Sequence, residues 1–88
     1  MGMNRVEKVI ISGVPRKYIE IYLGEIADSI KPGGVYSGPD WEIHVVSAQD
    51  KRFRNISIPQ TRVLFISNAA TIERLVQDFR MKFMSAGG

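Results

Sequence analysis

Hydrophobic and polar residues along this chain follow two repeats, one typical of strands and one typical of helices. Residues 6–12 are largely apolar and run into Ser12-Gly13-Val14-Pro15, so we predict a strand followed by a break. Between residues 15 and 30, apolar side chains recur every three or four positions, which predicts an amphipathic helix that starts at Pro15. The apolar stripe of this helix consists of Ile19, Tyr22, Leu23, Ile26 and Ile30.

The middle of the chain reads as a loop followed by short strands. Residues 31–40 contain three glycines and two prolines and are predicted to form a loop with tight turns. Alternation predicts a half-buried strand over 41–47, and a second strand over 53–58 after a polar turn. Pro59-Gln60 ends that strand as a bulge or a turn, because proline cannot donate to a ladder. The apolar run 63–66 predicts a further strand.

The last part of the chain repeats the helical spacing. Ser67-Asn68 provides a helix cap, because either side chain can accept from the first free N–H groups. A second helix is predicted over 69–84, with Ile72, Leu75, Val76, Phe79 and Phe83 on its apolar face. Residues 1–4 and 85–88 are predicted to be frayed ends.

These elements predict one α+β domain that spans residues 1–88. Right-handed crossovers place both helices on one face of an antiparallel-rich sheet of three to four strands. The order is βαββα, or βαβββα if Pro59 marks a true turn. Either order gives a ferredoxin-like layout that lacks its last strand.

Two strands are apolar on both faces, although two helices can cover only one face of the sheet. Val9-Ile10-Ile11 and residues 63–66 have this composition, which is typical of strands buried on both sides. We therefore predict that the uncovered face packs against another surface, most simply a second copy of the chain in a dimer, with a foreign protein as the alternative. The predicted interface residues are Ile10, Val46, Phe53, Val63 and Phe65.

Composition removes several classes of protein from consideration. The chain has 88 residues, 44% of them hydrophobic and 24% charged, which favours a folded domain over disorder. It has no cysteine, so disulfides, thiolate nucleophiles and most structural zinc sites are excluded. The first residues lack a secretory apolar run and no segment could span a bilayer, so we expect a cytoplasmic protein without a membrane partner.

One acid–histidine cluster occurs in the predicted strand 41–47. Asp40, Glu42 and His44 would share one strand face, where neighbours lie ~7 Å apart and the outer two ~13 Å apart. Such a spread cannot hold one ion, so we predict no metal site. No catalytic triad can be assigned either. Histidine titrates near neutrality, so His44 and Glu42, with Tyr36 from the glycine-rich loop, form a candidate ligand-binding site or small active site.

A basic cluster with an aromatic residue lies in the predicted hairpin region 51–62. Cations that flank an aromatic ring can contact phosphates and stack a base. The candidate nucleic-acid-binding residues are Lys51, Arg52, Phe53, Arg54 and Arg62. The net charge of +3 is modest for a nucleic-acid-binding domain. The alternative interpretation is therefore a solvated turn with a buried Phe53.

The sequence ends in Gly87-Gly88. This pair resembles the end of ubiquitin-like proteins and the related sulfur carriers, whose diglycine is activated as an adenylate or a thiocarboxylate. In that family a strand and a flexible tail precede the diglycine, whereas a helix is predicted here up to about residue 84. The order of elements also differs, so we interpret the two glycines as a tail that follows a helix.

Taken together, these patterns favour a small non-catalytic module that self-associates or binds another protein and needs no cofactor. Binding of RNA or single-stranded nucleic acid through the basic hairpin is the first alternative. A ligand-binding or catalytic role around His44 is the second.

Overall fold

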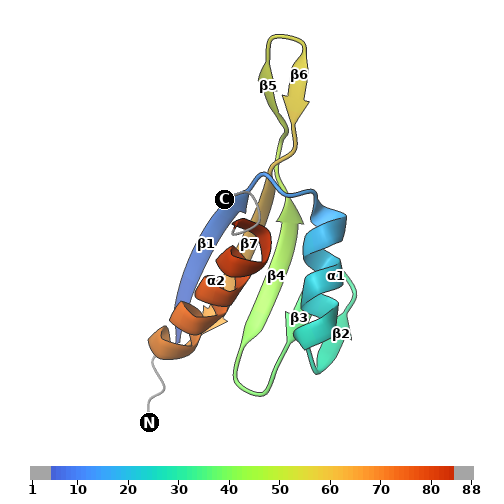
Figure 1. The fold of residues 1–88 in the computed structure, drawn as a ribbon. Coiled ribbons are helices and arrows are strands. Elements are labelled where there is room, and N and C mark those ends of the chain that lie inside the picture. Colours follow the sequence, from blue (N-terminus) through green and yellow to red (C-terminus); the bar gives the residue numbers. More distant parts are fainter. Residues whose placement is uncertain (1–4, 85–88) are drawn as a thin grey trace.

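The structure is a computed structural model that describes residues 5–84. It contains two helices and seven strands, which follow one another in a βα-β-β-β-β-β-βα order (Figure 1). Their bounds are β1 Val6–Ser12, α1 Arg16–Ile26, β2 Ser29–Lys31, β3 Val35–Ser37, β4 Glu42–Ser47, β5 Lys51–Phe53, β6 Ile56–Ile58, β7 Thr61–Ser67 and α2 Ala69–Met84. The predicted α+β class is confirmed. The predicted frayed ends, 1–4 and 85–88, lie outside the described residues.

Five strands form the main sheet, in the order β1-β7-β4-β3-β2. β7 pairs antiparallel with both β1 and β4, so β1 and β4 run in the same direction with β7 between them. α1 follows β1 and leads to β4 through the β2–β3 pair. It packs on β4, while α2 packs on β7 and β1. Both helices therefore cover the same face of the sheet (Figure 1). The β1-α1-β4 unit is a split βαβ motif, in which β7 fills the gap between the parallel strands.

The prediction of three to four strands was wrong, partly because the glycine-rich segment pairs instead of forming a loop. The predicted helix 15–30 ends at Ile26, and Ser29–Lys31 pairs with Val35–Ser37 across a three-residue turn. Gly33 and Gly34 have φ angles of 88° and 80°, so the two glycines reverse the chain where other residues would be strained. Ile30 lies in β2 and is exposed instead of extending the helical stripe.

The predicted strand 53–58 is also wrong, because the chain reverses inside it. Phe53 pairs with Ile56 across a turn at Arg54-Asn55, so β5 and β6 form a separate two-stranded hairpin. The hairpin projects from one end of the main sheet (Figure 1). Its stem continues the β4–β7 pair, since the Ala48 N–H donates to the Gln60 carbonyl at 3.0 Å. The strand predicted over 63–66 is longer and spans Thr61–Ser67.

The core lies between the helices and one face of the sheet. Side chains of β7 alternate, so Thr61, Val63, Phe65 and Ser67 are buried while Arg62 is exposed. Two buried hydroxyls fix the ends of this strand: Thr61 donates to the Val14 carbonyl and Ser67 to the Asp40 carbonyl. The buried apolar set is Ile19, Leu23, Tyr36, Trp41, Ile43, Val45, Val63, Phe65, Ile72, Leu75, Val76 and Phe79.

The second helix matches its predicted bounds. The Asn68 carboxamide oxygen accepts from the Thr71 N–H at 2.9 Å, which is the expected cap. Phe79 packs edge-on against Phe65, with 5.9 Å between ring centroids, and so joins the helix to the centre of the sheet. No helix within residues 5–84 is long and apolar enough to cross a membrane.

Candidate functional site

The face of the main sheet that the helices leave uncovered carries a set of exposed apolar side chains. The strand registers align these side chains in two rows across β1, β7 and β4. In one row Leu64 lies between Val9 and His44, and in the other Arg62 lies between Ile11 and Val46. Val9, Ile11 and Val46 are 51%, 55% and 47% exposed. We call this surface the open face and define it by Val9, Ile11, His44, Val46, Arg62, Leu64 and Ile66. Charged side chains within an exposed apolar patch are typical of a protein-binding surface.

Most of the predicted interface residues lie elsewhere. Val63 and Phe65 are 0% and 1% exposed beneath the helices, and Ile10 packs against the same core. Successive residues of a strand point to opposite faces, so choosing the wrong parity placed these residues on the wrong face. Phe53 lies on the projecting hairpin, and Val46 alone of the predicted set lies on the open face.

The charge of one β7 residue indicates which residues of this strand lie on the open face. Arg62 must lie on the solvated side of the strand, and Leu64 and Ile66 share its face. Through the antiparallel registers, this choice places Val9 and Ile11 of β1 on the open face as well.

The predicted ligand-binding trio does not come together. Glu42 and His44 lie next to each other on the open face, and the His44 Nε2 atom is 2.8 Å from a Glu42 carboxylate oxygen. Tyr36 instead points to the opposite face of the sheet, where it is 5% exposed. Two hollows lie along β1 and α2, and neither is lined by His44. Among residues 5–84, no group of three acidic or histidine side chains could hold a metal ion.

Tyr36 belongs to a polar cluster beneath α1. Its hydroxyl donates to one carboxylate oxygen of Glu20, and the other oxygen is 2.6 Å from the Arg16 Nε atom. The hydrogen bond from Tyr36, with help from Arg16, holds the pKa of Glu20 below its usual value of 4.5 although burial opposes this shift. Burial, together with Glu20, raises the pKa of Tyr36 to about 12. This cluster ties α1 to β3, and its groups are already satisfied by one another.

Stability is expected to fall at alkaline pH because of Tyr36. Between pH 10 and about 12, Tyr36 loses its proton in the unfolded chain but keeps it in the folded protein. The free energy of unfolding therefore falls as the pH rises through this range, with a slope that approaches ~1.4 kcal/mol per pH unit. Denaturant titrations across this range measure the slope. The variant Tyr36→Phe is expected to flatten it, whereas Tyr22→Phe, which removes a tyrosine whose pKa is raised less, should flatten it less. Equal slopes in wild type and Tyr36→Phe would contradict the assignment.

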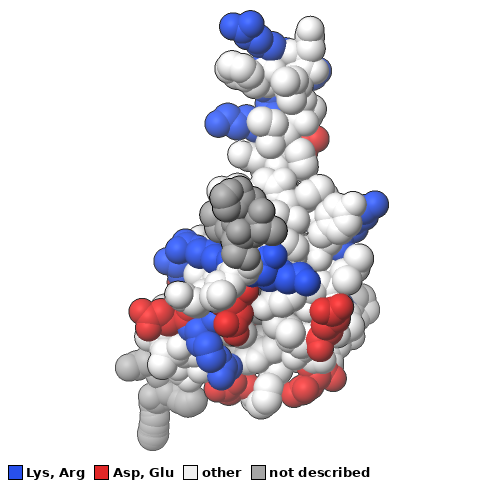
Figure 2. All heavy atoms as spheres, in the orientation of Figure 1, with Lys and Arg blue, Asp and Glu red and all other residues white. Residues whose placement is uncertain are grey.

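The projecting hairpin gathers four of the five predicted nucleic-acid-binding residues. All residues from Lys51 to Ile58 are exposed, and Phe53 is 59% exposed instead of buried. The Arg54 guanidinium lies over the Phe53 ring, 5.6 Å from its centroid, and Arg54 has a φ of 57°, which is unusual for a long side chain. Basic side chains mark the tip and side of the hairpin in Figure 2. Arg62 is separate from this group, because it lies on the open face.

Comparison with known proteins gives one relationship. Residues 7–88 match the family of archaeal MoaD-like proteins. This match starts in β1, covers both helices and extends through Gly87-Gly88, which lie outside the described residues. No curated protein and no solved structure matches the chain. Because the match covers nearly the whole sequence, the chain belongs to the family of archaeal MoaD-like proteins.

Proposed function

We propose that this chain is a non-catalytic carrier of the ubiquitin-like kind, which is bound by a partner enzyme and presents Gly87-Gly88 to it. The observation that carries the proposal is the family match, which includes the two glycines. Gly87-Gly88 resembles the end of ubiquitin-like proteins and sulfur carriers. The absence of a Cβ atom in both residues suits a segment that must enter a narrow active site.

The reaction at the terminus would be carried out by the partner enzyme. A carboxylate oxygen of Gly88 attacks the α-phosphorus of ATP, and pyrophosphate leaves, which gives an acyl adenylate. Hydrosulfide then attacks the acyl carbon and AMP leaves, which gives a thiocarboxylate. Neither step needs a nucleophile or a base from this chain, and the Tyr36 hydroxyl and the Glu20 carboxylate are bonded to each other.

The open face is the surface we assign to partner recognition. Its three most exposed apolar side chains come from two strands that flank β7, and Arg62 and the Glu42–His44 pair add polar groups beside them. Such a surface gains affinity from apolar burial and orientation from the charges.

The proposal is tested on the protein purified from the cells that naturally make it. We expect the mature chain to end at Gly88, and a fraction of it to carry sulfur in place of one carboxylate oxygen, measured by intact mass and by a reagent that labels thiocarboxylates. The variant Gly87→Val should abolish loading, and Val46→Asp should reduce it about tenfold or more by placing a charge in the interface.

A matched control separates the open face from general surface effects. Ile21 is 60% exposed on α1, so Ile21→Asp also replaces an exposed β-branched apolar side chain with aspartate, but away from the open face, and should load normally. A mature chain that continues past Gly88, or a chain that is never loaded in cells grown with ample sulfur, would overturn the carrier proposal. Normal loading of Val46→Asp would remove the open face from it.

Self-association through the open face remains a prediction. The solution mass, measured by light scattering at low and high salt, decides it: a dimer that Val46→Asp dissociates would mean that a second copy competes with the partner for this face. A monomer in both buffers would contradict self-association and leave the open face free.

Single-stranded nucleic acid is a second candidate partner, at the hairpin. The exposed Phe53 ring with Arg54 beside it could stack a base while Lys51 and Arg52 contact phosphates. Fluorescence anisotropy with a labelled single-stranded RNA should then show binding that weakens with salt and falls about tenfold in Arg54→Glu. Lys31→Glu, the same charge change in β2, is the control. Absence of binding at low salt, or equal loss in both variants, would exclude this role.

A further inference from the structure

The outer edge of β1 has no neighbouring strand. In the order β1-β7-β4-β3-β2, β1 stands at one end and pairs with β7 alone, so the backbone groups on its other side are unpaired within residues 5–84. From β1 the chain passes through α1 and the β2–β3 pair to β4, which lies two positions from β1 with β7 between them. A strand that followed α2 with the same right-handed crossover would skip over β1 and occupy this edge. Residues 5–84 therefore leave one strand position beside β1 unfilled, which corresponds to the last strand of the ferredoxin-like layout.

A groove runs along this vacant position, between β1 and the side of α2. At one end a hollow of about 750 Å³ lies between the start of β1 and the first turns of α2. At the other end a second hollow, of about 400 Å³, is lined by Ile10, Phe79 and Phe83. Arg80 borders both hollows, so they adjoin each other along the strand, and we call the two together the groove.

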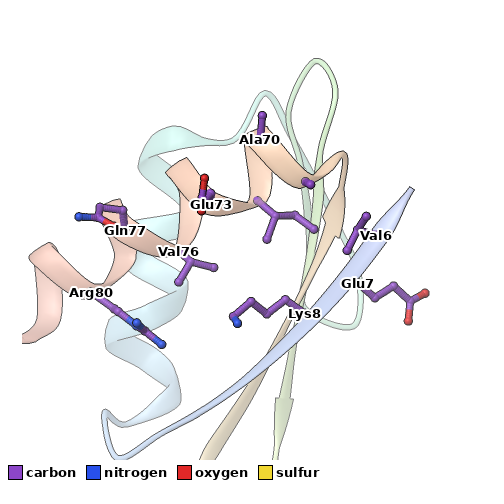
Figure 3. A pocket seen from close by; sticks show the side chains of 10 residues that line it. Val6, Glu7, Lys8, Ala70, Glu73, Val76, Gln77 and Arg80 are labelled. Atoms are coloured by element: carbon purple, nitrogen blue, oxygen red, sulfur yellow. The ribbon is translucent and has the colours of Figure 1, made fainter. Parts of the chain in front are cut away.

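Two basic side chains line the groove, and the acidic Glu73 of α2 also lines its first hollow. Lys8 extends from β1 and Arg80 from α2 into the space between the two elements, whereas Glu7 points to the other side of the strand (Figure 3). Among the described residues neither Lys8 nor Arg80 makes an ion pair. Val6 and Ile10 flank Lys8 on the same side of β1, because side chains two residues apart share a face. The groove side of β1 therefore reads apolar, basic, apolar.

We propose that this groove binds an extended segment of a partner protein, which adds to the edge of β1 as a sixth strand. Its groove-facing residues, at alternate positions, are apolar, acidic and apolar. The backbone would pair with the free edge of β1, and the acidic side chain would lie between Lys8 and Arg80. This site shares Ile11 with the open face but lies on the α2 side of β1, and it does not depend on the carrier function.

The charge of Lys8 explains why we assign a partner segment and not a second copy. Two β1 strands that pair edge to edge with both helix layers on the same side would place their Lys8 side chains opposite or near each other, which is unfavourable. An inward-pointing charge on an edge strand also disfavours pairing with purely apolar strands. A strand that carries a carboxylate at the matching position removes both penalties.

The test uses the full chain and capped synthetic peptides in which Val, Glu and Ile occupy three alternate positions. NMR titration should show shifts that are confined to β1 and the adjacent side of α2. Replacing the peptide Glu with Lys should weaken binding about tenfold. Lys8→Glu should reverse this preference and bind the Lys peptide better. Arg74→Glu, a charge reversal on α2 at a residue that does not line the groove, should keep the original preference.

Backbone pairing has its own test. A strand uses alternate N–H groups on each edge, so N-methylation at one set of alternate peptide positions should abolish binding, and methylation at the other set should be tolerated. Equal tolerance of both sets, shifts confined to the open face, or no binding of any peptide would overturn the proposal. Concentration-dependent shifts of β1 without peptide would also overturn it, because a second copy would then occupy the edge.

Discussion

Replacing Phe65 with alanine is expected to lower the free energy of unfolding by about 3–5 kcal/mol. Phe65 is 1% exposed at the centre of β7, between β1 and β4, and its ring packs edge-on against Phe79. Truncation removes the ring from the core between the sheet and the helices. It leaves a cavity that the close-packed neighbours can fill only in part. For a domain of this size the loss is a large share of the total stability. Urea titration followed by circular dichroism measures it.

The neighbouring residue provides the control. Leu64 lies on the open face, half-buried between Val9 and His44, so Leu64→Ala should cost only about 1 kcal/mol. Both changes remove a large side chain from the same strand and differ chiefly in the face. Similar losses for the two variants would mean that the open face is covered in solution, as it would be in a stable dimer.

The contrast between Phe65 and Leu64 also shows which feature of the sheet could not be predicted from the sequence. A helix reveals its buried side through spacing, so Ile72, Val76 and Phe79 were assigned to the core correctly. A strand with apolar residues on both faces does not reveal its buried side, because its odd-numbered and even-numbered residues are equally apolar. The sheet therefore could be predicted to have an apolar uncovered face, but the residues on it could be chosen only from the position of Arg62.

The extra strands escaped prediction for a different reason. β2, β3, β5 and β6 have three residues each, which is too short for alternation to stand out from a loop. Their pairing depends on reversals at Gly33-Gly34 and at Arg54-Asn55. The first reversal has strong turn residues, but these residues are equally typical of an unpaired loop. The second places an arginine at positive φ, which no turn preference indicates.

The candidate sites depended on tertiary placement to different degrees. The basic hairpin could be found from sequence, because Lys51, Arg52, Phe53 and Arg54 are consecutive. The groove could not, since Lys8 and Arg80 are far apart in the chain and become neighbours only when α2 packs beside β1. The diglycine was interpreted as a tail because a helix precedes it. The helix is present, and the family match is what makes the carrier interpretation the stronger one.

Replacing Gly34 with alanine is expected to cost about 2–4 kcal/mol, as a strained backbone and a steric contact add together. Its φ of 80° is unfavourable for an alanine by ~1–2 kcal/mol. A Cβ atom at Gly34 would also lie 2.8 Å from the Val45 carbonyl oxygen and 2.6 Å from the Arg16 guanidinium. The arginine can move, but the carbonyl belongs to β4, and the Val45 N–H donates to the Gly34 carbonyl at 2.8 Å. The turn must therefore separate from β4 to admit a methyl group.

Gly33 separates the two contributions, because it has a φ of 88° but no atom lies within 4 Å of the place that an alanine methyl group would take. Gly33→Ala should therefore cost only the conformational part, ~1–2 kcal/mol, and the excess loss in Gly34→Ala measures the contact with β4. The displaced Arg16 should also lose its contact with Glu20, whose pKa it helps to hold low. The stability lost as the pH falls through the titration of Glu20 should therefore be smaller in Gly34→Ala and unchanged in Gly33→Ala. Equal losses in the two variants would mean that the turn moves freely away from β4, and the β2–β3 pair would then be a loosely held edge of the sheet.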